Sequence, residues 1–331
     1  MTDPAAPLAA SAADPLPIII DTDPGQDDAV AILLALASPE IEVLGLSVVA
    51  GNVPLELTAR NARIVCELAG RTDLPVHAGC ALPLRRPLVT AEQVHGKTGL
   101  DGPVLPEPAM PLAQGHAVDF IIDTLRGRAA RSVTLCALGP LTNIATALER
   151  APDIAERIGR IVLMGGAYFE VGNITPAAEF NIHVDPHAAA SVFACGAPIT
   201  VLPLDVTHKA LVTRARNDAF RALGTPAGRA VAEMTDFFER FDLRKYGSEG
   251  APLHDPCVIA WLLAPQIFSG REVNVEIETT SELTMGMTVA DWWGVTDRPV
   301  NALFIGDLDA DAFFSLLTER LGRIAPAVPA A

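Results

Sequence analysis

The stretch Ile18–Val30, which reads IIIDTDPGQDDAV, constrains the fold more than any other part of the chain. Three isoleucines end at Asp21, Pro24-Gly25 follow at once, and an apolar periodic segment then covers Ala29–Ala37. A short β-branched run predicts a buried strand, the Pro-Gly pair predicts a sharp turn, and the periodic segment predicts a helix. We therefore expect a strand–turn–helix unit near the start of the chain.

Four carboxylates crowd this turn: Asp21, Asp23, Asp27 and Asp28. Like charges at such close spacing repel, and each raises the pKa of its neighbours. Asp27 and Asp28 alone could serve a helix N-terminus, where the macrodipole favours negative charge. That explanation does not account for Asp21 and Asp23 on the strand side. The cluster therefore predicts a positive partner, most simply a divalent cation.

The bulk composition excludes several classes of partner. The chain has 331 residues, a net charge of −16 and a hydrophobic fraction of 50%. So acidic a protein is not expected to bind nucleic acid or an anionic membrane surface. Five cysteines without a CxxC motif predict free thiols in a reducing compartment, and therefore a cytoplasmic location. Residues 1–16 lack the features of a signal peptide, and we expect a flexible tail ahead of one domain at 17–325.

Predicted strands and helices alternate along most of the chain. Such alternation predicts an α/β fold with a mostly parallel central sheet flanked by helices, in a single domain. The expected strands are 18–21, 42–49, 74–78, 133–137, 160–164 and 199–204, with further strands at 273–280, 287–292 and 301–305. The expected helices are 29–37, 54–69, 117–126, 142–150, 186–195, 215–245, 257–263 and 310–321.

Polar clusters follow the predicted strands. In an open parallel sheet, ligands bind at the carboxyl ends of the strands. The polar stretches 21–28, 51–52, 138–143 and 165–181 all fall at those ends. The long Pro- and Gly-rich segment Gly79–Pro111 contains His95-Gly96 and is also expected to be functional, because long loops in compact domains usually are. These segments are predicted to converge on one site.

Seven short motifs in order resemble the nucleoside hydrolase family. They are DTDPGQDDA at 21–29, GN at 51–52, HG at 95–96, GPLTN at 139–143, MGG at 164–166, GN and EFN within 172–181, and HDP at 254–256. The resemblance covers nearly the whole chain. It implies a single α/β domain with a Rossmann-like core, a tightly bound Ca²⁺, and hydrolysis of the N-glycosidic bond of ribonucleosides to ribose and free base. It also implies a homodimer or homotetramer that works in purine or pyrimidine salvage.

The resemblance also implies a role for individual residues. The carboxylates of Asp23, Asp28 and Asp255 and the main-chain carbonyl of Leu138 would hold Ca²⁺. Asp23 would also act as the base that takes a proton from a metal-activated water. His254 and His95 would contact the nucleobase, and either one could be the acid that protonates it. The ribose would be bound by Asp27, Asn52, Met164, Asn173, Glu179, Asn181 and Asp255.

The chemistry of these groups fits the implied reaction. Carboxylate and carbonyl oxygens are hard ligands that suit Ca²⁺, and no Cys/His cluster indicates zinc. Cleaving a ribosyl C–N bond develops positive charge on the sugar, which carboxylates and amide oxygens stabilise. The departing base needs a proton or a hydrogen bond, for which histidine is suited.

Two other functions are compatible with parts of the sequence. Asp21-Thr22-Asp23 resembles the opening of a haloacid-dehalogenase-type phosphatase, but Pro24-Gly25 follow where that motif requires a small residue and Thr or Val. A nucleoside-binding protein without turnover would retain the pocket, but it would be expected to lack the base or a metal ligand. The motifs fit both pyrimidine-preferring and broader hydrolases, so they do not set a base preference. The segment Phe237–Tyr246 is expected to flank the base, and Tyr246 is expected to reach the base pocket.

Overall fold

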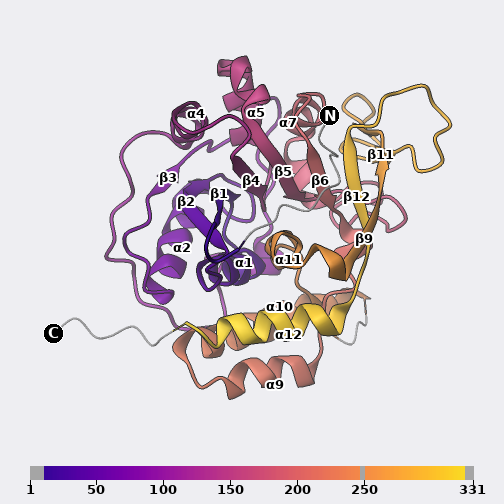
Figure 1. Cartoon of the computed structure of the whole chain (residues 1–331). Coiled ribbons are helices and arrows are strands. Elements are labelled where there is room, and N and C mark those ends of the chain that lie inside the picture. Colours follow the sequence, from indigo (N-terminus) through magenta and orange to yellow (C-terminus); the bar gives the residue numbers. More distant parts are fainter. Residues whose placement is uncertain (1–10, 247–249, 325–331) are drawn as a thin grey trace.

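The computed structural model describes residues 11–246 and 250–324, and an eight-stranded sheet lies at its centre (Figure 1). The strand order is β3-β2-β1-β4-β5-β6-β12-β9, and every neighbouring pair is parallel except β12 and β9. The strands are β1 (Leu16–Thr22), β2 (Ile41–Val48), β3 (Val76–Ala78), β4 (Val133–Ala137), β5 (Ile158–Met164), β6 (Ile199–Leu202), β9 (Phe268–Val273) and β12 (Ala302–Leu308). The predicted α/β class with a mostly parallel sheet is confirmed.

Helices cover both faces of the sheet. Figure 1 shows α4, α5 and α7 on one face and α1, α2 and α10 to α12 on the other. The helices are α1 (Gln26–Leu36), α2 (Leu55–Leu68), α3 (Glu92–His95), α4 (Ala117–Gly127), α5 (Thr142–Arg150), α6 (Phe180–Val184), α7 (Pro186–Phe193), α8 (Leu204–Thr207), α9 (Arg214–Ala222), α10 (Pro226–Tyr246), α11 (Pro256–Leu263) and α12 (Ala310–Leu321). Among the described residues, no helix is long and apolar enough to cross a membrane.

The isoleucine run of β1 lies between the two apolar layers. Ile18 and Ile20 pack into the cluster on the α1 face, and Ile19 packs into the cluster on the α5 face. Successive side chains of a strand point to opposite faces, so a strand covered on both sides needs an uninterrupted apolar run. All three isoleucines are fully buried. The run therefore places β1 in the middle of the sheet, as observed.

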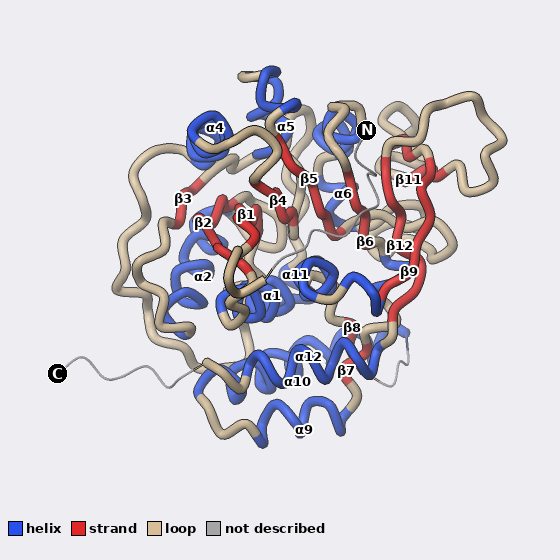
Figure 2. Tube along the Cα trace, in the orientation of Figure 1, coloured by secondary structure: helices blue, strands red, loops and turns tan. Residues whose placement is uncertain are grey.

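Strands are added to the sheet first on one side of β1 and then on the other. β2 and β3 extend the sheet to one side of β1, whereas β4, β5 and β6 extend it to the other (Figure 2). Loops leaving adjacent strands at such a switch point turn away from each other and leave a crevice at the carboxyl ends. The acidic stretch Asp21–Asp28 leaves β1 and Leu138 leaves β4, so both border this crevice.

Two of the differences from the prediction concern a long helix and a strand of the central sheet. The helix expected over 215–245 is two helices, because Gly224 has a φ of +67° and Pro226 begins α10. Gly after one helix and Pro at the start of the next is a recognised boundary signal that the periodicity obscured. Strand β9 was not predicted, because its central residues Ser269–Glu272 are exposed and polar at the edge of the sheet.

Smaller elements and the termini complete the fold. Two short antiparallel pairs join β7 (Leu211–Val212) to β8 (Ala251–Pro252) and β10 (Val275–Ile277) to β11 (Thr288–Ala290). Two 3₁₀ helices cover Pro152–Glu156 and Pro265–Ile267. Residues 1–10 of the expected tail lie outside the described part of the chain, as do 247–249 and 325–331.

Candidate active site

A cavity of about 390 Å³ lies at the carboxyl ends of the strands, near the switch point between β1 and β4. Ten of the twelve site residues predicted from the sequence line it: Asp27, Asn52, His95, Leu138, Met164, Asn173, Glu179, Asn181, His254 and Asp255. The other two, Asp23 and Asp28, are fully buried beside them. The structure thus brings all twelve residues into one region.

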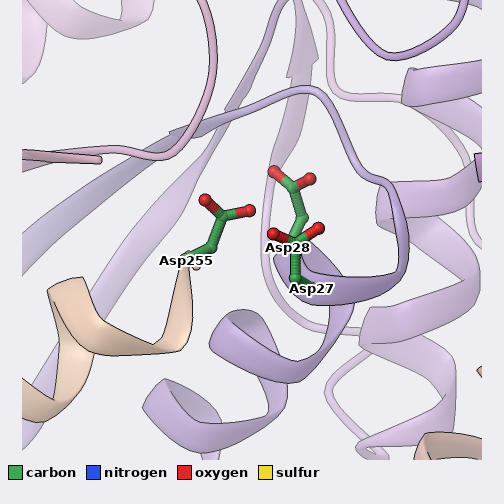
Figure 3. A group of neighbouring side chains, drawn as sticks. All are labelled: Asp27, Asp28 and Asp255. Carbon is green, nitrogen blue, oxygen red and sulfur yellow. The ribbon is translucent and has the colours of Figure 1, made fainter. Parts of the chain in front are cut away.

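Three carboxylates form a group that could hold a metal ion. Asp27, Asp28 and Asp255 each offer an oxygen within 4.8 Å of the others, and all three side chains are buried. Figure 3 shows Asp27 and Asp28 at the start of α1 and the Asp255 carboxylate directed toward them from the start of α11. Burial, followed by the charge of Asp28, raises the pKa of Asp27 to about 7. Burial, followed by the charges of Asp27 and Asp28, raises the pKa of Asp255 well above its ordinary value.

Asp23 lies outside that group and is enclosed by two glycines. Its Oδ2 accepts a 2.7 Å hydrogen bond from the main-chain N–H of Asn52. Its Oδ1 is buried and has no hydrogen-bond partner among the described residues. A Cβ at position 51 would lie 2.0 Å from Oδ2, and a Cβ at position 139 would lie 2.1 Å from Oδ1. The glycines of the GN and GPLTN motifs therefore make room for this carboxylate.

Asp28 is oriented by three donors. The Thr22 hydroxyl donates to its Oδ1 at 2.5 Å, and the Gly25 N–H donates to its Oδ2 at 2.9 Å. The Asn52 side-chain amide donates to the same Oδ2 at 3.1 Å. Burial still raises the pKa of Asp28, in spite of these hydrogen bonds. These hydrogen bonds hold the carboxylate in a position where it could be a metal ligand. No positively charged side chain among the described residues forms a salt bridge with it.

The donor set fits a hard divalent cation. None of the salt bridges found among the described residues involves Asp23, Asp27, Asp28 or Asp255. Buried carboxylates need a compensating charge or they become protonated. The ligand atoms are all oxygens, which suit Ca²⁺ or Mg²⁺. Oδ1 of Asp23, which has no hydrogen-bond partner among the described residues, could be a further ligand atom.

Asp21 lies near the end of strand β1 and forms hydrogen bonds with residues of two neighbouring elements. Its Oδ1 accepts hydrogen bonds from the Ser47 hydroxyl at 2.5 Å and from the Asn143 side-chain amide at 2.9 Å. The same amide also donates to the main-chain carbonyl of Val48 at 3.2 Å. These bonds join the ends of β1 and β2 to the start of α5. Burial raises the pKa of Asp21 to about 7.

Amide and carboxylate groups line the side of the cavity formed by the 165–181 segment. Asn181 donates through its side-chain amide to the carbonyls of Leu138 (2.8 Å) and Met164 (3.2 Å). Glu179 accepts from the N–H groups of Gly166 (3.0 Å) and Ile182 (3.1 Å). Burial raises the pKa of Glu179 to about 7. Asn173 accepts through its side-chain oxygen from the N–H of Phe180 at 2.9 Å.

His95 lies in α3 and is buried against the first helix. Its Nδ1 is 2.6 Å from the side-chain oxygen of Gln26, and its ring centroid is 5.5 Å from that of Phe238. Burial lowers the pKa of His95 to about 3. The surrounding segment, expected to be an irregular loop, therefore contains a short helix that fixes this imidazole.

His254 lines the same cavity and directly precedes Asp255. Its Nδ1 is 2.7 Å from the hydroxyl oxygen of the fully buried Thr207. The ring of His208 lies 5.8 Å from that of His254. Burial lowers the pKa of His254 well below its ordinary value, and the neighbouring His208 lowers it further.

The residues near the cavity that were not assigned to it from the sequence include Gln26, Thr207, His208 and Phe238. Thr207 and His208 follow β6, so the rule that placed the other residues at strand ends would have found them. Phe238 falls in the segment 237–246 that was expected to flank the base, and it lines the cavity. Tyr246 was also considered for the base pocket, but its side chain lies outside the described residues.

Comparisons with known proteins agree with the family that the motifs resemble. Residues 18–315 match the family described as inosine-uridine preferring nucleoside hydrolase. An uncharacterised protein of Schizosaccharomyces pombe is 55% identical over 93% of this chain and 99% of its own length. The pyrimidine-specific ribonucleoside hydrolase RihA of Salmonella typhimurium is 50% identical over 92% of this chain and 98% of its own length.

Solved structures give the same answer. A purine-preferring ribonucleoside hydrolase from Gardnerella vaginalis superposes with a TM-score of 0.87 at 33% identity, covering 93% of this chain and 100% of that one. A plant nucleoside hydrolase superposes with a TM-score of 0.86 at 34% identity, covering 94% and 100%. The chain therefore belongs to the inosine-uridine preferring nucleoside hydrolase family, and it is a ribonucleoside hydrolase.

Proposed function

We propose that this hydrolase cleaves the N-glycosidic bond of ribonucleosides with the help of one Ca²⁺, and releases ribose and the free base. One observation carries the proposal: Asp27, Asp28 and Asp255 converge within 4.8 Å beside the partnerless Oδ1 of Asp23. Asp23, Asp28, Asp255 and the carbonyl of Leu138 would hold the cation. When bound, the cation would neutralise the carboxylates and acidify a water molecule.

The protein's own groups would activate the water and hold the sugar. Asp23 is the proposed base, because Asn52 donates to its Oδ2 and its Oδ1 has no partner among the described residues. The carboxylates and amide oxygens around the ribose would stabilise positive charge as the C–N bond lengthens. The proposed ribose ligands are Asp27, Asn52, Met164, Asn173, Glu179, Asn181 and Asp255, and all of them line the cavity.

His254 is the proposed donor to the leaving base. No other acceptor for the buried Thr207 hydroxyl is found among the described residues, so this hydroxyl donates to Nδ1 of His254. The ring proton then lies on Nε2. Since the ring lines the cavity, this N–H can hydrogen-bond to the base as it departs.

Pyrimidine ribonucleosides are the proposed preferred substrates. The support is the relative RihA, which is named pyrimidine-specific and is 50% identical over 92% of this chain. The purine-preferring enzyme from Gardnerella vaginalis is 33% identical. Hydrolysis of uridine, cytidine, inosine, adenosine and guanosine should be compared at equal enzyme concentration. A larger kcat/KM for any of the three purine nucleosides than for both pyrimidine nucleosides would contradict this preference.

A homodimer or homotetramer in the cytoplasm completes the proposal. Several large apolar side chains are exposed on the β11 side of the molecule, including Leu283, Trp293 and Val295, and would suit a subunit interface. The five cysteines form no disulfide, which suits a reducing compartment. Light scattering of the purified protein would measure its mass directly, and a monomer would contradict the assembly.

A further inference from the structure

Gln26 is held in one orientation by two main-chain carbonyls. Its side-chain Nε2 donates to the carbonyl of His95 at 2.9 Å and to the carbonyl of Asp101 at 3.1 Å. A main-chain carbonyl only accepts hydrogen bonds, so the NH₂ group must be the part of the amide that faces both oxygens. The hydrogen-bond network therefore settles which end of this buried amide is oxygen.

The same amide determines which nitrogen of His95 carries the proton. The Gln26 Oε1 lies 2.6 Å from Nδ1 of His95. An amide oxygen only accepts, so Nδ1 must carry a hydrogen. A neutral imidazole has a single N–H, which leaves Nε2 as an acceptor. No hydrogen bond to this Nε2 is found among the described residues, and the ring lines the cavity.

The surroundings keep the His95 imidazole neutral and close to Gln26. Its side chain is buried, and burial lowers its pKa to about 3. A Cβ at position 25 would lie 2.5 Å from Nδ1, so Gly25 lets the ring approach the start of α1. The Phe238 ring packs against the imidazole at a centroid distance of 5.5 Å. The imidazole is thus confined in position as well as in protonation.

We propose that Gln26 is a positioning residue that fixes His95 as a hydrogen-bond acceptor, so that His95 recognises an N–H or NH₂ group on the nucleobase. His95 then does not protonate the leaving base. The inference deepens the proposed function and rests on it for the identity of the ligand. With His254 presenting N–H, the two imidazoles together offer one donor and one acceptor. Uracil complements this pair, because its N3–H lies between two carbonyl oxygens.

Nitrogen NMR of the unaltered protein tests the protonation directly. We expect the ¹⁵N-labelled His95 ring to show a protonated Nδ1 and an unprotonated Nε2 at neutral pH. His95→Asn assigns the signals by removing them. Gln26→Met should shift the proton toward Nε2. Gln114→Met changes an exposed glutamine that does not line the cavity and should leave the pattern unchanged. A proton on Nε2 in the unaltered protein would overturn the proposal.

Kinetics with an N-methylated substrate tests the recognition. In the unaltered enzyme, uridine should have a kcat/KM roughly 10- to 100-fold higher than 3-methyluridine, which lacks the N3–H. Gln26→Met should reduce kcat/KM for uridine and change that for 3-methyluridine by less than about 3-fold, so that the ratio falls toward 1. Gln114→Met should keep the ratio. An unchanged ratio in Gln26→Met would refute control by Gln26.

The two failures are distinguishable. If the unaltered protein hydrolyses none of the five common ribonucleosides, the proposed function fails, whereas the NMR spectrum still decides the protonation of His95. If ribonucleosides are hydrolysed but Nε2 carries the proton, the proposed function stands and the role of Gln26 fails.

Discussion

The carboxyl groups and the imidazoles of the site respond oppositely to burial. We call Asp23, Asp27, Asp28 and Asp255 the carboxylate end of the site, and His95 and His254 its imidazole end. Burial raises the pKa of every carboxyl group and lowers the pKa of both imidazoles, because a buried site disfavours the charged form of either group. Both ends therefore tend toward neutrality when nothing is bound.

The difference indicates separate roles for the carboxylates and the imidazoles. A bound cation would restore charge at the carboxylate end, where catalysis needs it. The imidazole end would remain neutral, and it would act by hydrogen bonding to the base. The two ends should consequently respond differently to metal, to leaving-group chemistry and to pH, and four predictions test that difference from the largest expected effect to the smallest.

Removing one carboxylate should abolish function at the carboxylate end. We expect Asp28→Ala to lose the bound Ca²⁺ and all measurable uridine hydrolysis, because Asp28 belongs to the three-carboxylate group. Metal analysis of the purified variant, together with a hydrolysis assay, measures both. Asp153→Ala, at an exposed aspartate paired with Arg126, is the matched control and should retain metal and activity. An active Asp28→Ala protein without metal would contradict the proposal.

Truncating the leaving-group donor should affect only substrates that need one. We expect His254→Ala to lower turnover of inosine and uridine by roughly 10²- to 10⁴-fold, the usual range for general acid catalysis. Hydrolysis of p-nitrophenyl riboside should stay much closer to the unaltered enzyme, because p-nitrophenolate leaves readily as an anion. Metal content should be unchanged. Equal losses on both substrates, with metal retained, would mean that His254 positions the sugar instead.

The aromatic wall of the imidazole end should contribute to substrate binding. Phe238 packs beside His95 and lines the cavity, so we expect its ring to contact the base. Phe238→Ala should raise KM for uridine by about 5- to 100-fold, as expected for the loss of base–aromatic stacking. Phe238→Tyr should retain most of the affinity. An unchanged KM in Phe238→Ala would place the base elsewhere.

Stability should depend on pH through the buried carboxyl groups. Glu179 has an ordinary pKa of 4.5 that burial raises to about 7 in the folded protein. The folded state then binds more protons than the unfolded state between these values, so metal-free protein should lose stability as pH rises from 4.5 to 7. Asp21 and Asp27, also raised to about 7, act in the same direction.

Thermal or urea unfolding of metal-free protein at pH 5 and pH 7.5 measures this effect. Glu179→Gln should reduce the difference in unfolding free energy between pH 5 and pH 7.5 by about 1–2 kcal/mol. Added Ca²⁺ should stabilise the protein more at pH 7.5 than at pH 5, because the carboxylates must lose protons to bind it. Equal stabilisation at both pH values would mean that the buried carboxyl groups are already ionised.

Local sequence patterns predicted much of the fold. The isoleucine run, the Pro-Gly turn and the periodic helix predicted β1 and α1, because each depends on residues that are neighbours in the chain. Polar residues just after the predicted strands were placed at one edge of the sheet by the geometry of parallel strands. The polar edge strand β9 was missed, because its exposed residues have no apolar alternation.

Only the tertiary structure decided how the site residues meet. Asp255 lies more than two hundred positions from Asp27 and Asp28, and its approach to within 4.8 Å depends on the packing of α11 beside α1. The enclosure of Asp23 by Gly51 and Gly139 joins three separate strand ends. The proton on Nδ1 of His95 follows from Gln26, 69 positions away. The chain itself determined the strand, the turn and the acidic cluster, because local sterics and hydrophobic periodicity act between near neighbours. The distances and hydrogen bonds between remote residues exist only after the core has packed.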